Sequence, residues 1–121
     1  MVSAAIGLAL AVAPTGADSR TAAAEEAPFL KANDAAMDKM MSGMAVKPTG
    51  DVDHDFAAMM IPHHEGAIKM AEAELRFGHN EQLRRIAQEI IVDQQQEIAA
   101  MRLALGETLP PSTPSPTGSP Q

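Results

Sequence analysis

The chain contains no cysteine, no tryptophan and no tyrosine among its 121 residues. Without cysteine there can be no disulfide framework, no zinc–thiolate site, no lipidated cysteine and no thiol nucleophile. Aromatic side chains normally supply much of the buried area of a small core, yet this chain has only three phenylalanines beside nine methionines. Methionine therefore takes the place of aromatic residues. The length supports at most one small domain with tails.

Positive charge is also scarce, with nine Lys and Arg residues against 16 Asp and Glu residues and a formal net charge of −7. This balance argues against nucleic acid and anionic membrane surfaces as partners, and it suits the attraction of cations. Long apolar runs are missing as well, because the run over residues 2–13 is too short for a comfortable membrane span. We expect no stable membrane span in the mature chain.

The apolar run at the N-terminus is followed by small residues that suit signal-peptidase cleavage near Ala17 or Ala24. We interpret residues 1–24 as a signal peptide, which predicts a secreted or periplasmic bacterial protein. The alternative is a disordered or helical Ala-rich extension of a cytoplasmic protein. In either case residues 25–108 form the expected domain, and the Pro-, Ser- and Thr-rich residues 109–121 are expected to be disordered.

A first helix is predicted over residues 28–44, with Pro28 tolerated in its first turn. Four methionines at the spacing i, i+3, i+4 and i+7 share one face of it: Met37, Met40, Met41 and Met44. Such a stripe can simply fill irregular gaps in a core. The lack of leucine among the four, and the methionines of the next helix, favour metal ligands instead.

The central stretch, residues 53–75, follows a loop over residues 46–52 and can be capped by Asp51 or Asp53. On a helix of about 100° per residue, one arc of its surface collects Phe56, Met59, Met60, His63, Ala67 and Met70, with His64 at the edge and Glu65, Lys69 and Glu72 on the opposite side. A plain packing face would favour Leu, Ile and Val. Thioether sulfur and imidazole nitrogen are instead ligands for a soft metal ion.

Pro62 interrupts this helix, because it cannot donate a hydrogen bond to the carbonyl of Ala58 and its ring crowds that turn. We expect a kink or a restart that aims His63 and His64. The alternative is a helix that begins at Pro62 after a short turn.

A third helix is predicted over residues 81–105, in a tight antiparallel turn after the second. Gly78 is expected to end the second helix in a left-handed conformation and Asn80 to cap the third. Gly106 and Pro110 are stop signals. The apolar face of this helix consists of Leu83, Ile86, Ala87, Ile90, Ile98 and Met101.

Gln94 and Glu97 lie in the middle of that apolar face. A buried Gln or Glu is costly unless it is hydrogen-bonded, so we expect both to support an imidazole N–H of His63 or His64. The alternative is that this part of the face lies at a wet, open end of the bundle.

Ligand softness points to copper, since thioether sulfur suits Cu(I) and Ag(I) but not Zn(II), Mg(II) or Ca(II), while imidazole also accepts Cu(II). The Glu-x-x-His pairs of di-iron bundles and the His-Glu-x-x-His motif of zincins are both absent. No nucleophile stands in a recognisable arrangement with a base. We therefore expect a metal-binding protein and not an enzyme.

The string MMIPHHEGAIKMAEAEL, with QQQEIAAM in the next helix, resembles the domain of unknown function family 305 over about residues 35–105. The family pattern is met by Asp53, Phe56, Met60, Ile61, His63, His64, Ala67, Ile68, Met70 and Ala71, and in the third helix by Gln94, Glu97, Ile98 and Met101. The resemblance implies a small exported bacterial protein with a ferritin-like bundle, as in copper-tolerance proteins of the CopM type. Its first helix departs from that family, which often mixes His with Met there.

We therefore predict an all-α, small antiparallel bundle of three main helices, completed to four by the N-terminal segment or by a homodimer partner. It would bind Cu(I), and also Ag(I) or Cu(II), for sequestration, tolerance or transfer to or from a copper-donor or acceptor protein. The predicted ligands are His63, His64, Met59, Met60, Met70 and Met101, with Met37, Met40, Met41 and Met44 as a second cluster or entry relay and Gln94 and Glu97 behind them.

Two other functions fit the same pattern. Met-rich faces also dock partner helices, so the protein could be an interaction module without metal. The other is a metal-dependent enzyme that uses His63, His64 and Glu65 around a harder metal.

Overall fold

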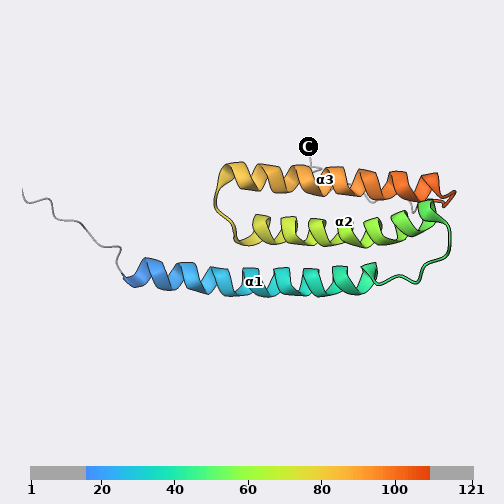
Figure 1. Cartoon of the computed structure of the whole chain (residues 1–121). Helices are drawn as coiled ribbons and strands as arrows, with labels where there is room; N and C mark the ends of the chain where they lie inside the picture. The colour runs from blue at the N-terminus through green and yellow to red at the C-terminus, as the bar shows by residue number, and fades with distance from the viewer. Residues whose placement is uncertain (1–15, 110–121) are drawn as a thin grey trace, which may run out of the picture.

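The computed structural model describes residues 16–109, and it contains three helices and no strand within that range. Helix α1 spans Gly16–Met44, α2 spans Val52–Phe77 and α3 spans Glu81–Ala104. Successive helices run antiparallel (Figure 1). The prediction of a small all-α helical bundle with three main helices is confirmed. Residues 1–15 and 110–121, which include Pro110 and most of the expected tail, lie outside the described range.

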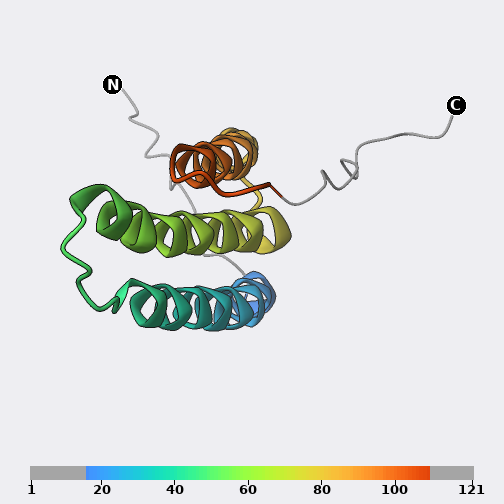
Figure 2. The ribbon, with the colours of Figure 1, turned by 90° about the vertical axis from the view of Figure 1, so that its right-hand side faces the viewer.

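Helix α2 lies between α1 and α3, and within the described residues α1 and α3 do not contact each other. The three helices therefore form an open layer, which the end-on view shows as a stack with α2 in the middle (Figure 2). A layer of this kind leaves both of its broad faces uncovered. The chemistry of each face is therefore determined by the side chains that do not point toward a neighbouring helix.

Helix α1 begins at Gly16 and not at about residue 28, so Pro28 lies in its interior. Part of the segment interpreted as a signal peptide or disordered extension is thus helical. The reason is local, because Ala and Glu in Thr21–Ala27 are strong helix formers. Pro28 removes one hydrogen bond at an exposed position, where water can satisfy the freed carbonyl group.

The start of α2 is fixed by two aspartates. Asp51 is the N-cap, and its carboxylate accepts hydrogen bonds from the backbone N–H groups of Asp53 and His54 at 3.0 and 3.1 Å. In the loop before it, the Thr49 hydroxyl donates to Asp55 Oδ1 at 2.7 Å, and the Thr49 backbone N–H donates to the same carboxylate. These bonds lower the pKa of Asp55, with the Thr49 hydroxyl as the largest cause.

Pro62 lies inside one continuous helix, so a helix start at Pro62 is wrong. The first turns of α2 bend toward α3 (Figure 1). A bend one turn before a proline is expected, because the ring crowds the carbonyl four residues earlier.

The turn between α2 and α3 corrects one prediction. Gly78 has φ −80° and ψ 151°, so it is extended and not left-handed. The carbonyl groups at the end of α2 are instead satisfied by the Arg84 guanidinium, which donates to Leu75 O at 2.6 Å and to Gly78 O at 2.9 Å. Asn80 caps α3 as predicted, accepting from the N–H groups of Gln82 and Leu83.

Gly106 ends α3 in the left-handed conformation, with φ 79°. Its N–H donates to Leu103 O, and the next N–H, that of Glu107, donates to Arg102 O. This pair of bonds is a Schellman motif, so the predicted stop at Gly106 is confirmed.

Two glycines allow α1 to approach α2 closely. A Cβ atom on Gly43 would come within 2.6 Å of Pro62 Cβ, and one on Gly66 would come within 2.9 Å of Met40 Cβ and of its sulfur. Any side chain at either position would force the helices apart. Met40 therefore packs between α1 and α2.

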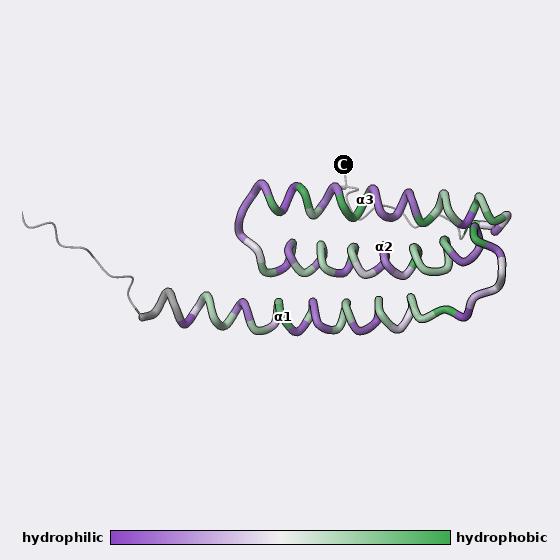
Figure 3. Tube along the Cα trace, viewed as in Figure 1, coloured by the Kyte–Doolittle hydropathy of each residue, from purple (hydrophilic) through white to green (hydrophobic). Residues whose placement is uncertain are grey.

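The interior is made of small side chains. The buried apolar residues are Ala36, Ala57, Ile68, Ala71, Ala73 and Ala87, and no large side chain in the described part of the chain is fully buried. Hydrophilic and hydrophobic residues alternate along every helix (Figure 3). Among the described helices none is apolar over a length that would cross a membrane.

Candidate metal centre

The two faces of the layer differ in chemistry. A groove of about 330 Å³ between α2 and α3 is lined by Ala67, Met70, Ala71, Glu74, Leu83, Ile86, Ala87 and Ile90. A hollow of about 510 Å³ between α1 and α2 is lined by residues that include Lys39, Glu65 and Lys69. Since Glu65 lies on the side of α2 opposite Ala67, the groove and the hollow open on opposite faces of the layer.

We call the side of the groove the Met/His face and the other side the charged face. On α2 the Met/His face consists of Phe56, Met59, Met60, His63, Ala67 and Met70. By helical position, Met37 and Met41 of α1 lie on the same side, because Lys39 lines the hollow on the other. The charged face carries ion pairs, with Lys69 Nζ 2.8 Å from Glu72 Oε2 and Arg102 Nη2 3.8 Å from Glu65 Oε1.

His64 is the buried polar residue of the interior, with 7% of its surface exposed. Its Nε2 lies 2.5 Å from Glu97 Oε2. An ionised carboxylate only accepts hydrogen bonds, so Nε2 carries the hydrogen and donates it. Nδ1 is buried and has no hydrogen-bond partner in the described structure. In the neutral ring Nδ1 then holds an unshared lone pair, which is the form in which imidazole binds a metal.

Glu97 thus contacts an imidazole of the central helix, but it does so from the surface, with 59% of its side chain exposed. The expectation that Glu97 itself is buried is wrong. It lies at the margin of the α2–α3 contact, where a long side chain reaches inward while its backbone stays near water. Gln94 is half-buried, and within residues 20–109 it makes no hydrogen bond to either histidine.

His63 is exposed and lies beside His64, with ring centroids 5.9 Å apart and the ring planes at 61°. One imidazole is therefore fixed in the interior and the next is open to solvent on the Met/His face. Rotation about its side-chain bonds can change the position of the His63 ring nitrogens without moving the helix.

The antiparallel register of α2 and α3 brings two predicted ligands to the same level. His64 lies opposite Glu97, so Met60, one turn before His64, lies at the level of Met101, one turn after Glu97. Both thioethers are half-buried. The structure therefore places Met60, His64 and Met101 along one seam between the two helices.

The other predicted ligands are more scattered. Met59 and Met70 are exposed on α2, and Met37 and Met41 are exposed on α1, whereas Met44 is half-buried. Met40 packs against Gly66 in the α1–α2 contact. The structure thus separates Met40 from the surface methionines, although its sequence spacing groups it with them.

Harder ligands do not gather in the same way. Among the described residues, no group of three or more His, Asp or Glu side chains lies close enough together to hold a metal ion.

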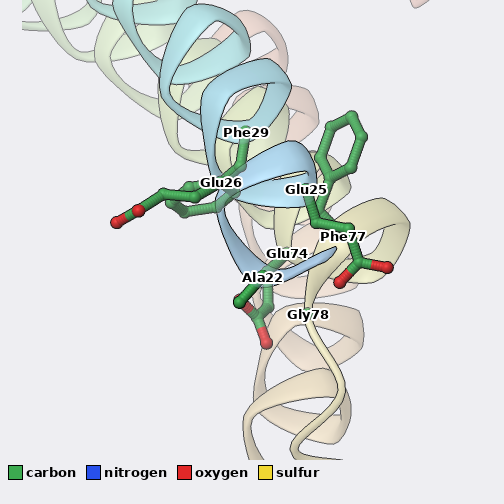
Figure 4. Close-up of a pocket in the computed structure, with 7 residues that line it drawn as sticks. All are labelled: Ala22, Glu25, Glu26, Phe29, Glu74, Phe77 and Gly78. Atoms are coloured by element: carbon green, nitrogen blue, oxygen red, sulfur yellow. The ribbon is translucent and has the colours of Figure 1, made fainter. Parts of the chain in front are cut away.

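An acidic hollow of about 380 Å³ lies where α1 passes the end of α2, and it is lined by Ala22, Glu25, Glu26, Phe29, Glu74, Phe77 and Gly78. Its three carboxylates point apart and not toward a common centre (Figure 4). Glu25 instead contacts the imidazole of His79 at 2.7 Å. This hollow is not a convergent cation site.

The residues that position the helices around the site were not identified from the sequence. Gly43 and Gly66 set the distance between α1 and α2, and Arg84 closes the end of α2. A glycine inside a helical pattern is a signal of close approach that was available in the sequence. The role of Arg84 had no such signal, because it depends on the geometry of the turn.

A family model with the description "Domain of unknown function (DUF305)" matches residues 10–105 of the chain. The match begins earlier than the resemblance found by motif, which started at about residue 35. No curated protein matches the sequence.

Proposed function

This chain belongs to the DUF305 family, and from that premise we propose that it binds soft metal ions as cargo, chiefly Cu(I) and also Ag(I). The proposed role is sequestration, tolerance or transfer outside the cytoplasm. Imidazole would extend the affinity to Cu(II). The role needs binding and release, not turnover.

The state of His64 carries the proposal. Its ring is buried, its Nε2 is held by Glu97, and its Nδ1 has no hydrogen-bond partner in the described structure. A buried nitrogen acceptor without a partner destabilises the folded state. A metal ion at Nδ1 would remove that cost, and the carboxylate on the other nitrogen is the arrangement that orients metal-binding histidines and makes them more basic.

The residues along the same seam supply suitable further ligands. Met60 and Met101 place two thioethers at one level of the seam, about one helical turn from His64 and Glu97. Cu(I) binds thioether sulfur well, and these sulfurs are poor ligands for Zn(II), Mg(II) and Ca(II). In this proposal Met60, His64 and Met101 hold the ion.

The exposed groups would serve capture. His63, Met59 and Met70 of α2 lie on the open Met/His face. Met37 and Met41, which belong to the neighbouring helix α1, lie on the same face. In a single, unpaired chain an ion could bind first to these flexible surface ligands and then move to the seam. The net charge of −7 would raise the local concentration of cations.

The test is an anaerobic Cu(I) titration of the full chain against a chromophoric chelator. The chain has four histidines, which permits a matched comparison of two double variants. Changing His63 and His64 to Ala should weaken Cu(I) binding roughly 100-fold or more, because even loss of an outer partner weakens metal binding about 10–100-fold.

The control changes His54 and His79 to Ala, both of which are exposed and lie away from the seam. We expect little change in affinity, with the same helicity by circular dichroism in both double variants. Equal losses in the two double variants would contradict the proposal, as would a wild-type chain that cannot compete with a weak chelator.

A further inference from the structure

The Met/His face carries large apolar side chains that nothing in the described structure covers. Leu30, Met37, Met41, Phe56, Met59, Met70, Leu83 and Ile86 are all exposed, and by helical position and groove lining they lie on this one side of the layer. Exposed apolar surface that is continuous over several helices marks an interaction site on soluble proteins.

The interior of one chain, by contrast, contains few large apolar side chains. Five of the six buried apolar residues are alanines, and none of the large side chains described is fully buried. Leucine, isoleucine, phenylalanine and methionine supply most of the burial in a small domain. Eight of the twelve large apolar side chains that are exposed in the described structure lie on the uncovered face, so covering this face would add to the apolar burial of the fold.

We propose that a second copy of this chain packs against the Met/His face, so that two three-helix layers enclose a shared core. A two-fold pairing places the same patch of each copy against the other. The apolar side chains that are exposed in one layer would then become interior.

The dimensions of the face fit such a pairing. Helix α3 has 24 residues, which corresponds to a length of about 36 Å at 1.5 Å per residue. Three helices with axes about 8–10 Å apart span roughly 20 Å between the outer axes. The product is roughly 700 Å² for each copy, close to the roughly 800 Å² per partner of a stable interface.

Other occupants fit less well. The apolar run over residues 2–13 has 12 residues and would extend about 18 Å as a helix, which covers only half the length of the face. A cationic partner would be drawn to carboxylates, but of the eight residues that line the groove only Glu74 is charged. An apolar surface is best matched by an equally apolar one, which a second copy supplies.

The test measures the mass of the full chain by sedimentation equilibrium over a range of concentrations, with a chelator present throughout. The wild type should have twice the mass of one chain. Because no metal is present, this result is independent of the proposed function, and loss of Cu(I) binding would leave the expected mass unchanged.

Two matched double variants on α3 locate the interface. Leu83 and Ile86 line the groove on the Met/His face and are 52% and 49% exposed, whereas Val92 and Leu103 are 50% and 57% exposed on the other side of the helix. Changing Leu83 and Ile86 to Glu should weaken dimerisation at least tenfold, while changing Val92 and Leu103 to Glu should leave it intact. None of these four residues belongs to the proposed metal site.

A wild type that stays monomeric at every concentration overturns the proposal. So does equal weakening by the two double variants, or a dimer that is lost when residues 1–15 are deleted. Because charge on the groove could itself prevent folding, the milder variant Ile86→Ser is measured alongside. It should keep wild-type helicity and still shift the equilibrium toward monomer.

Discussion

The two broad faces of the layer share one central helix and differ in how their side chains are satisfied. On the charged face, Lys69 pairs with Glu72 and Arg102 with Glu65. These charged groups have partners and also remain partly exposed to water. On the Met/His face, thioethers and apolar side chains stand exposed, and the seam beside them holds an imidazole nitrogen without a partner.

The comparison shows that the thioether and imidazole side chains of α2 lie mainly on one side of the helix, away from its ion pairs. A helix of 3.6 residues per turn can separate two chemistries over its whole length. In α2 the charged residues Glu65, Lys69 and Glu72 lie on one face, and the thioether and imidazole groups lie mainly on the opposite face, where we propose that an ion or a second copy binds. The predictions below test that division, beginning with the largest expected effect.

The first prediction concerns Glu97, whose carboxylate holds Nε2 of His64. Glu97→Ala should weaken Cu(I) binding roughly 10–100-fold, because the imidazole loses the group that fixes its tautomer and orientation. Chelator competition measures the change. The matched control is Glu89→Ala, an exposed glutamate elsewhere on α3, for which an equal loss of affinity would show that only net charge matters.

The second prediction concerns the contact that holds α1 beside α2. Gly43→Ala should destabilise the protein by up to about 2 kcal/mol, because overpacking costs about 1–3 kcal/mol and the better helix propensity of Ala offsets about 1 kcal/mol. The added Cβ atom would otherwise lie 2.6 Å from Pro62 Cβ. Urea unfolding measures the effect.

Ser42→Ala is the neighbouring control, because Ser42 is exposed and needs no movement of α2. We expect it to change the free energy of unfolding by less than about 0.5 kcal/mol. If Gly43→Ala were equally harmless, the close approach of the two helices would not be a determinant of the fold.

The third prediction addresses the charged face. Arg102→Ala removes a partially exposed ion pair with Glu65, and it should lower stability by no more than about 0.5–1 kcal/mol, since such pairs are screened by solvent. Cu(I) affinity should stay unchanged. A large drop in affinity would mean that the two faces are not independent.

The smallest effect is a dependence on acid pH. The pKa of Asp55 is lowered in the folded protein, first by the Thr49 hydroxyl. A lowered folded pKa contributes stability that is present above the unfolded value and is lost as the pH falls through the folded value. Thermal unfolding below about pH 4 should therefore show a smaller pH dependence in Thr49→Val than in the wild type, and identical curves would contradict this assignment.

Much of the frame could be predicted from sequence because it depends on local chemistry. Asp51, Asn80 and Gly106 act as caps or stops as predicted, and they do so through bonds to their near neighbours. The spacing of histidines and methionines likewise placed them on one arc of α2. The contact of Glu97 with a histidine was also predicted, although the buried member of the pair is His64 and not Glu97.

What could not be predicted depends on distances between helices. Periodicity says which side chains share a face, but not which face is covered by a neighbour, so the exposure of the Met/His face was not foreseen. Met40 shows the same limit, because only the approach of Gly66 reveals that it packs inside while Met41 is 61% exposed. The extended Gly78 depends on Arg84, a residue of the next helix.

The most direct test of the account is X-ray absorption spectroscopy at the copper edge on the full chain loaded anaerobically with one equivalent of Cu(I). We predict a first coordination shell of sulfur together with imidazole nitrogen, and loss of sulfur when Met60 and Met101 are both changed to Leu. A shell of nitrogen and oxygen alone, or a sulfur signal that the double variant leaves unchanged, would contradict the assignment of the seam between α2 and α3 as the site.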